Sequence, residues 1–363
     1  MSGWLFPSRT IAWYTARLFL VRTFAFLVGV IVVLETLDVL GESSRILAAG
    51  NSEGAIWHYV ALRVPQLIAL FLPFAVLLGT LATFFTLSAN SEVIIVKASG
   101  VSAHQILAPF VIAALGVAVL NFAFNERVVV KANKALSIWQ AAGYKPAAAG
   151  GALVAEGWGR SADDLFHAET VTGSGADTRL HAVTLYERHQ NRLQRIVRAA
   201  EARPVDAGWL LTRAQVFDVR LGTQTRADAL IFHSHISAAQ FTTVAVNPKF
   251  LPFWTLLSAI RTQREAGKPV DALVAAANHK IAGPLSAVLM PLLGSVAAFG
   301  LARSGRLFVR AVIGMLLGFA FFVADNFMVA MGDFGTVPPA LAAWSAFALF
   351  FLIGEAVLFR TEE

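Results

Sequence analysis

Apolar residues along this chain gather in six long runs, which form two groups of three. The runs extend over about Leu18–Leu40, Val64–Ser91, Gln105–Asn125, Ile281–Ala302, Leu307–Met331 and Val337–Phe359. A helix needs about 20 such residues to cross the hydrocarbon core of a bilayer, which is ~30 Å thick. The pattern therefore predicts a membrane α-helical bundle of six transmembrane helices.

A second periodicity marks the region between the two groups. Short stretches there alternate apolar and polar residues with a period of two, as half-buried strands do. They are His181–Glu187, Arg195–Arg198, Trp209–Arg213 and Gln215–Val219. We expect an inserted all-β, jelly-roll-like domain at residues 126–253, after transmembrane helices 1–3 in residues 1–125. Residues 254–363 are expected to hold connecting helices, the first at 254–265 and the second from about 270, and transmembrane helices 4–6.

Composition agrees with a membrane protein and excludes several classes of site. The chain is 57% hydrophobic and 14% charged, whereas a soluble domain has roughly 25% charged residues. Its net charge of +6 does not indicate nucleic-acid binding, because the basic residues are scattered. With no cysteine, it has no disulfide, thiolate metal site or cysteine nucleophile. The first apolar run lacks a small-residue cleavage site after it, so we expect a retained span and not a signal peptide.

Charges in the connections predict the orientation. The N-terminal stretch carries Arg9, Arg17 and Arg22, and the connection between the fourth and fifth runs is also rich in arginine. The first-to-second and fifth-to-sixth connections are mainly acidic. Because positive charge stays on the cytoplasmic side, both termini are expected in the cytoplasm and the middle domain outside.

The sequence contains no recognised catalytic motif. A phosphate-binding loop, a Gly-x-Ser-x-Gly elbow and a His-Glu-x-x-His zinc motif are all missing, so no catalytic residue is expected. His233 and His235 share one face of a predicted strand, but no third ligand is evident. Two solvated histidines are the favoured interpretation, and no metal site is predicted. Acids within spans are functional candidates; Asp325 and Glu355 lie close to span ends, where interfacial solvation is the simpler explanation.

The connection between the second and third runs is the most informative segment. Asn90 or Ser91 can cap a short helix that has Glu92 in its first turn. Such a helix, with apolar contacts and an exposed acid, can dock into a groove of another protein and transmit force. A solvated turn is the alternative, and the pattern alone favours it. The candidate coupling residues are Ser91, Glu92, Val93, Ile94, Val96, Ala98, Ser99 and Gly100.

At this point the chain resembles a known family over nearly its whole length. The motifs are Leu72–Gly79, Ser91–Gly100, Val183–Arg188, His279–Leu285, Phe322–Asn326 and Val337–Pro339, in that order. They resemble the lipopolysaccharide export permeases LptF and LptG. The last two motifs, together with Ala98-Ser99-Gly100, favour the LptG type over its LptF-type paralogue. The resemblance moves the coupling-helix interpretation ahead of the solvated turn.

The resemblance implies a permease subunit of an ABC-type lipopolysaccharide exporter in the bacterial inner membrane. Such a subunit pairs with an LptF-like paralogue and binds an LptB-like ATPase dimer, which uses ATP and Mg. The chain itself would need no cofactor. Lipopolysaccharide would enter from the outer leaflet, and the periplasmic domain would pass it toward LptC and an LptA-like bridge.

The same resemblance suggests where the lipid would bind. Phe24, Phe26, Leu27, Val30, Phe319 and Phe322 could line a lipid cavity, although ordinary packing is the alternative for each. Arg45, Arg63, Arg127, Lys131 and Lys134 could bind headgroup phosphates, with interfacial snorkelling as the alternative. The first span ends in Glu35-Thr-Leu-Asp-Val-Leu-Gly-Glu42, where the family pattern has lysines, so the headgroup chemistry of this span departs from the family.

Two other classes of function stay open from the residues. An ion-driven exporter acting without an ATPase would need a buried titratable pair at mid-membrane, and the second, third and fourth runs carry no charge for one. A membrane-anchored receptor is the other, although six spans are more than an anchor needs.

Overall fold

The computed structural model describes residues 8–141, 143–144, 154–161, 164–172, 178–189, 192–205, 208–232, 251–265, 269–299 and 307–362. Contacts divide the chain into two compact units. The bundle unit comprises Met1–Gly41, Tyr59–Asn133 and Leu251–Glu363, and the sheet unit comprises Glu42–His58 and Lys134–Phe250. The sheet unit therefore begins later than the predicted boundary at residue 126, and it includes a segment between the first two spans.

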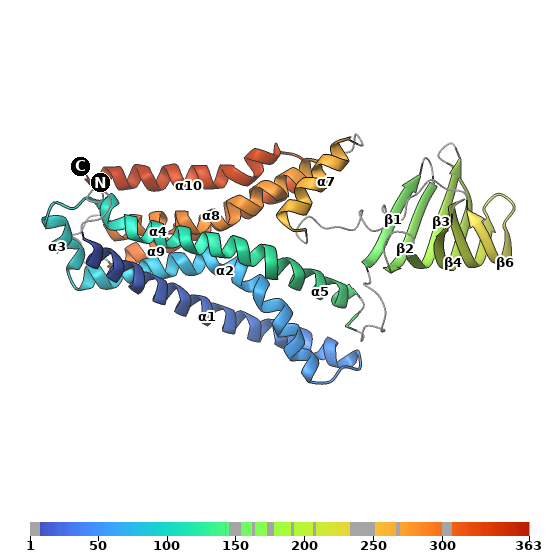
Figure 1. Cartoon of the computed structure of the whole chain (residues 1–363), viewed down its shortest axis with the longest axis horizontal. Coiled ribbons are helices and arrows are strands. Elements are labelled where there is room, and N and C mark those ends of the chain that lie inside the picture. The colour runs from blue at the N-terminus through green and yellow to red at the C-terminus, as the bar shows by residue number, and fades with distance from the viewer. Residues whose placement is uncertain are drawn as a thin grey trace. The chain divides into compact units, whose positions relative to one another are not determined.

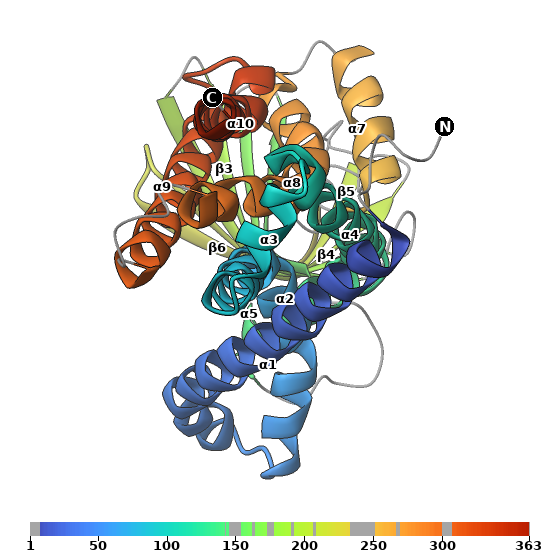
Figure 2. The ribbon, with the colours of Figure 1, turned by 90° about the vertical axis from the view of Figure 1, so that its left-hand side faces the viewer.

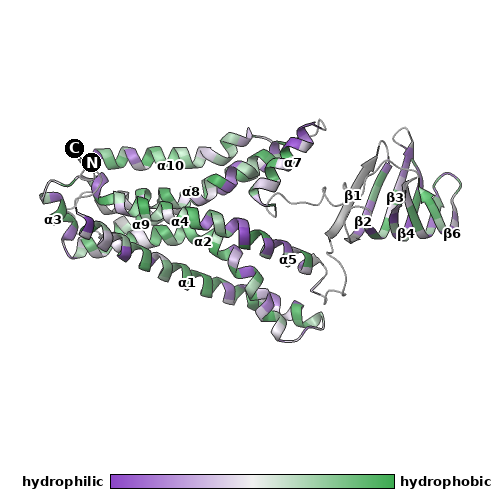
Figure 3. Ribbon diagram, in the orientation of Figure 1, coloured by the Kyte–Doolittle hydropathy of each residue, from purple (hydrophilic) through white to green (hydrophobic). Residues whose placement is uncertain are grey.

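Six helices in the described part of the chain are long and apolar enough to cross a membrane. They are α1 (Arg9–Ala48), α2 (Gly54–Ala89), α4 (Ala103–Phe124) with its continuation, α8 (Asp271–Phe299), α9 (Leu307–Asp333) and α10 (Pro339–Glu362). Each corresponds to one predicted run, which confirms the six spans. Figure 3 shows apolar residues along these helices and more hydrophilic ones in α5 (Val130–Ala141) and α7 (Phe253–Glu265).

The third span continues beyond its predicted end at Asn125. A five-residue π-helix, η1 (Asn125–Val129), follows α4 and leads directly into α5. The polar residues in this stretch suggested the start of a soluble domain, but helical geometry persists through them. A single π turn inside a longer helix is a local irregularity that often marks a functional site.

Helix α2 is the central packing element of the bundle. More than half of its apolar window is buried (56%), against 22% for α1 and 17% for α9. Gly79 of α2 lies directly against Thr23 of α1, and Gly318 of α9 lies against Leu77 of α2, with no room for a Cβ at either glycine. Small residues permit this close approach of membrane helices. Figure 1 shows α2 bending along its length, as expected of a helix that contains Pro65 and Pro73.

Aromatic rings join α1, α2 and α4 in the core. Phe84 and Phe110 stack with their centroids 4.7 Å apart, and Phe19 lies 5.4 Å from Phe110. On the other side, α8 packs against α4, α9 and α10. Figure 2 looks along the bundle and shows α1 and α9 at its edge. These two helices therefore present most of their apolar surface outward.

The bundle has two distinct ends. Helix α1 begins and α10 ends at the end that carries the short helix α3 (Glu92–Ala98), as Figure 1 shows. We call this the α3 end. The opposite end, where α4 continues into η1, we call the η1 end. Helix α1 therefore begins at the end of the bundle where α10 ends (Figure 1); that this end faces the cytoplasm stays a prediction of the charge pattern.

The described strands form one six-stranded antiparallel sheet in sequential order, β1-β2-β3-β4-β5-β6. They are β1 (Val154–Ser161), β2 (Asp164–Thr172), β3 (Arg179–His189), β4 (Arg192–Val205), β5 (Gly208–Asp218) and β6 (Thr223–Phe232). This confirms the inserted all-β domain. One face carries the buried cluster around Phe166, Leu185 and Trp209. His233 and His235 lie outside the described residues.

Two predicted strands, Trp209–Arg213 and Gln215–Val219, prove to be the single strand β5. Arg213 has a φ of 53°, and the buried residues Leu211 and Ala214 stand three apart instead of two. The same three-residue step occurs on β3 between Leu180 and Val183. The alternation of buried and exposed residues therefore shifts by one position within each of these continuous strands. For this reason, a strict period of two divides β5 into two predicted strands.

Candidate coupling helix and lipid-facing sites

Helix α3 has the limits that the sequence predicts. Ser91 stands at the N-cap with a φ of 58°, although its side chain makes no capping bond. Instead, Asn90 Nδ2 donates a hydrogen bond to Glu92 Oε1 at 3.3 Å. The helix ends at Ala98, and Gly100 adopts a φ of +85° that glycine favours.

The two sides of α3 have different roles. Val93 is buried and packs into the core of the bundle, with Val96 partly buried beside it. Ile94 and Ile95 are 58% and 65% exposed. Val93, one of the candidate coupling residues, therefore anchors the helix and offers no outward contact. The pattern missed Ile95, although two adjacent isoleucines in a short connecting helix could have signalled an outward apolar pair.

An apolar groove of about 210 Å³ lies beside α3. It is lined by residues of α1, α3 and α4 that include Ile11, Tyr14, Val96, Ile106 and Pro109. The groove joins α3 to the first turns of α1 and α4. The groove therefore has α3 on one side and the beginnings of two transmembrane helices, α1 and α4, on the other.

The link from α3 to α4 is short and well defined. Ser102 and Gln105 form a capping box: the Gln105 N–H donates to Ser102 Oγ at 3.2 Å, and the Ser102 N–H donates to Gln105 Oε1 at 3.1 Å. Capping of this kind satisfies two free N–H groups at a helix start. It fixes the start of α4 only a few residues after α3.

The candidate cavity residues divide into exposed and buried side chains. Phe24 and Phe319 are 67% and 56% exposed, Phe26 and Phe322 are also exposed, and Val30 is half-buried. Leu27 is buried against α2. The exposed residues lie on α1 and α9, the two peripheral helices, so they can meet a lipid or a partner, whereas Leu27 stabilises the bundle itself.

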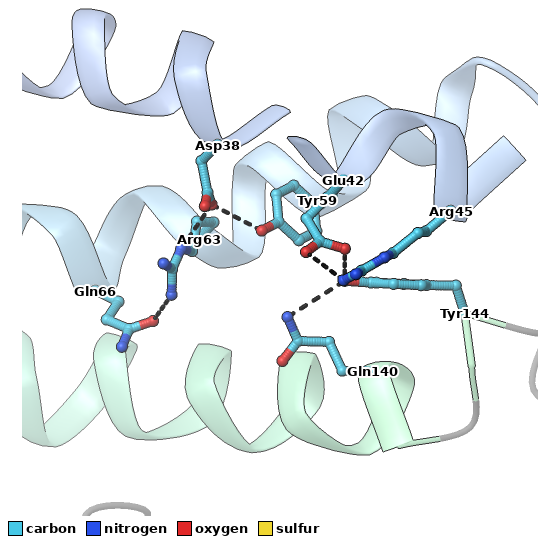
Figure 4. Close-up of polar contacts among 8 residues, drawn as sticks. All are labelled: Asp38, Glu42, Arg45, Tyr59, Arg63, Gln66, Gln140 and Tyr144. Carbon is cyan, nitrogen blue, oxygen red and sulfur yellow. Dashed lines mark hydrogen bonds and ion pairs between the residues drawn. The ribbon is translucent and has the colours of Figure 1, made fainter. Parts of the chain in front are cut away.

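Two of the candidate headgroup cations are engaged by carboxylates. In the bundle unit, Arg63 Nε donates to Asp38 Oδ2 at 2.8 Å and Arg63 Nη1 donates to Gln66 Oε1 at 2.6 Å (Figure 4). In the sheet unit, Arg45 pairs with Glu42 at 3.1 Å. The remaining candidates, Arg127, Lys131 and Lys134, are exposed on η1 and α5.

The structure adds a largely buried ion pair that the sequence did not indicate. Lys280 Nζ donates to Glu126 Oε1 at 2.9 Å, and each side chain is only 12% exposed. The other oxygen, Glu126 Oε2, accepts a hydrogen bond from the backbone N–H of Phe253 at 2.5 Å. Glu126 therefore ties η1 to α8 and to the first residue of α7. No sequence pattern joins residues so far apart.

Two histidines pair with the acids at the span ends. His279 Nε2 lies 3.2 Å from Asp325 Oδ2, and His104 Nε2 lies 3.3 Å from Glu355 Oε2. Asp325 and Glu355 therefore each have a histidine partner within the protein, whereas the sequence suggested that solvent alone surrounds them. His279 precedes the apolar run of α8, so its pair does not lie at mid-membrane. Among the described residues, no group of three possible metal ligands occurs.

In the sheet unit, Tyr144 gathers several polar contacts. Its hydroxyl donates to Glu42 Oε2 at 2.9 Å and accepts from Gln140 Nε2 at 3.3 Å, as Figure 4 shows. Asn51 Nδ2 donates to the Tyr144 carbonyl at 2.6 Å. Burial raises the pKa of the Tyr144 phenol above its ordinary value of 10.0, and the nearby Glu42 carboxylate acts in the same direction. The phenol therefore stays protonated and able to donate.

Six membrane helices, an inserted antiparallel sheet and an exposed short helix between two spans define the membrane subunit of a transporter. Residues 13–360 match the family model of the lipopolysaccharide export system permease LptF/LptG. The chain belongs to this family, which confirms the resemblance seen in its motifs. It is a multi-pass inner-membrane permease subunit for lipopolysaccharide export and not a catalytic enzyme.

Individual relatives agree with this assignment. The chain is 28% identical over 313 residues to the lipopolysaccharide export system permease protein LptG of Escherichia coli (strain K12), covering 83% of this chain and 84% of that protein. It is 26% identical over 295 residues to LptG of Haemophilus influenzae, covering 77% of this chain and 80% of that protein.

Proposed function

We propose that this permease works as the LptG-type half of an exporter powered by a separate ATPase that docks on α3. The two relatives named LptG support the LptG type, as do the motifs at residues 322–326 and 337–339. An LptF-like paralogue would supply the other half of the membrane unit. Both termini and α3 would face the cytoplasm, and the sheet unit the periplasm.

The observation that carries this proposal is the form of α3. Ile94 and Ile95 face outward, while Val93 holds the helix against the bundle. An outward apolar pair on a short anchored helix suits a groove in another protein. ATP bound with Mg in that ATPase would close it, and α3 would pass the motion to α1 and α4.

The peripheral helices would provide the lipid path. Phe24, Phe26, Phe319 and Phe322 lie exposed on α1 and α9 and offer apolar surface for acyl chains. Arg127 and Lys131 are exposed at the η1 end, where headgroup phosphates would lie. The sheet unit would then receive the lipid and pass it to LptC-like and LptA-like periplasmic partners.

Co-purification tests the docking step. Glu92→Ala, and separately Ile94→Ala with Ile95→Ala, should weaken association of the ATPase with the permease by about 30-fold, as expected when an interface anchor worth about 2 kcal/mol is lost. The amount of permease in the membrane should not change. ATPase recovery equal to that of the unaltered chain would refute docking on α3.

A matched control removes a charge from the residue just before the first turn of α2, whereas α3 follows its last turn. Glu53→Gln changes an exposed acid just before α2 and should leave ATPase recovery unchanged. Identification of the co-purified proteins tests the partners: a paralogue and an ATPase support the proposal. A chain that exports lipid alone would support the ion-driven alternative instead.

A further inference from the structure

A buried acid near the η1 end of α1 has no partner in the described part of the chain. Glu35 is 7% exposed, and neither of its carboxylate oxygens has a hydrogen-bond partner among the residues described. An unpaired buried carboxylate is costly. An acid inside a membrane span commonly marks a path for a substrate or an ion. A partner from outside the described residues is therefore expected at Glu35.

The surroundings of Glu35 have an excess of negative charge. Asp38 lies one turn further along α1, and the charges of Asp38 and Arg63 both act on Glu35. Arg63 already donates to Asp38 and to Gln66, and Tyr59 donates its hydroxyl to the same Asp38 oxygen, Oδ2, at 2.7 Å. One guanidinium thus faces two carboxylates.

The arrangement leaves an opening at Asp38. Both donors reach Oδ2, so Oδ1 remains an acceptor within the described residues, and the Asp38 side chain is 29% exposed. Figure 4 shows Tyr59 and Arg63 converging on Asp38. A ligand would meet Asp38 first, and a rotation of Glu35 toward it would give that carboxylate the partner it lacks.

The depth of the site indicates where the ligand comes from. Glu35 stands 17 residues after Leu18, which is roughly 26 Å along the helix. The site therefore lies just inside the far edge of the ~30 Å hydrocarbon core, within reach of the lipid headgroups beyond it. Because α1 is peripheral, a headgroup can approach it from the side.

The sign of the charge decides the class of ligand. A phosphate would meet two carboxylates and an arginine that is already engaged. A primary ammonium carries the missing positive charge and three N–H donors, which match the free oxygens of Glu35 and Asp38. We propose that Glu35 and Asp38 form a subsite for the primary ammonium group of a lipid headgroup.

This inference rests on the proposed function where the ammonium belongs to the exported glycolipid. The same group also occurs in the bulk lipid phosphatidylethanolamine.

The test uses the complex with its paralogue in nanodiscs of phosphatidylglycerol, which has no amine. Two probes are compared by microscale thermophoresis: lipid A with free phosphates, and lipid A with ethanolamine attached to its phosphates. We expect the ethanolamine-bearing probe to bind about tenfold more tightly.

Glu35→Gln should abolish this preference, because it removes the charge and keeps the shape. Asp38→Asn should do the same, while Glu53→Gln, which changes an exposed acid in the connection between α1 and α2, should keep the preference. If Glu35→Gln retains the preference, or both probes bind the unaltered complex equally, the subsite is refuted. A requirement for Ca²⁺ or Mg²⁺ with no effect of the amine would refute it as well.

Further measurements identify the source of the ammonium group and separate failure of the subsite from failure of the proposed function. Adding phosphatidylethanolamine to the nanodiscs should leave the preference intact if the glycolipid supplies the ammonium, and should erase it by competition if bulk lipid does; both support the subsite. Failure of the unaltered complex to bind either probe would refute the proposed function together with the subsite. Equal binding of both probes, with export intact, would refute the subsite alone.

Discussion

Two carboxylates with little solvent exposure, at the η1 end of the bundle unit, differ in their hydrogen-bond partners. Each oxygen of Glu126 has a donor, one from Lys280 and one from the backbone of Phe253. Neither oxygen of Glu35 has one among the described residues. Both side chains are nearly excluded from solvent, so the difference lies in their partners and not in their depth.

The difference separates a structural acid from a candidate ligand site. Glu126 joins three helical elements at the point where the chain leaves and re-enters the bundle, and its charge is compensated within the chain. A buried ion pair adds little over a well-packed apolar pair, but removing one partner leaves an uncompensated charge. Among the described residues, Glu35 has no hydrogen-bond donor of this kind, which suits a site completed by a group from outside.

The largest predicted effect comes from breaking the Glu126 pair. Lys280→Met should lower the free energy of unfolding by about 3–5 kcal/mol, because Glu126 is left buried with its charge unpaired. Urea unfolding of the permease in detergent, or its melting temperature, measures the loss. Adding Glu126→Gln to Lys280→Met should recover most of it, since the amide oxygen can still accept from Phe253.

The control for this change is an exposed lysine on a neighbouring element. Lys131→Met on α5 should alter stability by no more than about 0.5 kcal/mol. Equal losses for Lys131→Met and Lys280→Met would mean that the buried pair contributes nothing specific, and the comparison between the two carboxylates would no longer hold.

The next predicted effect is a change in stability of the opposite sign, at Glu35. Glu35→Leu should leave stability unchanged or raise it by about 1 kcal/mol, because it replaces an unpaired buried acid with an apolar side chain. The same substitution at Glu126 should be strongly destabilising, since it leaves Lys280 buried and unpaired. Comparing the two melting temperatures tests this directly. A similar loss at both positions would show that Glu35 has a stabilising partner and would weaken the ammonium subsite.

The sequence is sufficient to predict the membrane spans, but it is not sufficient to predict which carboxylate has a partner. An apolar run long enough to cross a bilayer has few alternatives to a helix, because every backbone group must be satisfied within the lipid. The six runs and the inserted strands therefore follow from local patterns. Glu126 and Lys280 are separated by 154 positions, and only the packing of α8 against α4 brings them together.

Helix α3 shows the same limit at short range. Its position and both ends follow from Ser91, Glu92 and Gly100, which are local signals. The direction of each side chain does not: Val93 turned inward and Ile95 outward. In a seven-residue helix, the apolar pattern is too short to fix which face meets the bundle.

The smallest effect concerns a third carboxylate, Glu42 of the sheet unit, which falls between the two extremes. Its side chain is 23% exposed, and it has an exposed arginine and the Tyr144 hydroxyl as partners. Tyr144→Phe should lower the free energy of unfolding by about 0.5–1.5 kcal/mol, the usual contribution of one hydrogen bond.

Burial raises the pKa of Tyr144 above 10.0 in the folded chain, so folding favours the protonated phenol. The stabilisation is therefore complete below about pH 10 and is lost as the pH rises through the raised pKa. Melting temperatures of the unaltered and Tyr144→Phe chains should differ at neutral pH and converge in alkali, and a gap that widened with rising pH would contradict a donating phenol.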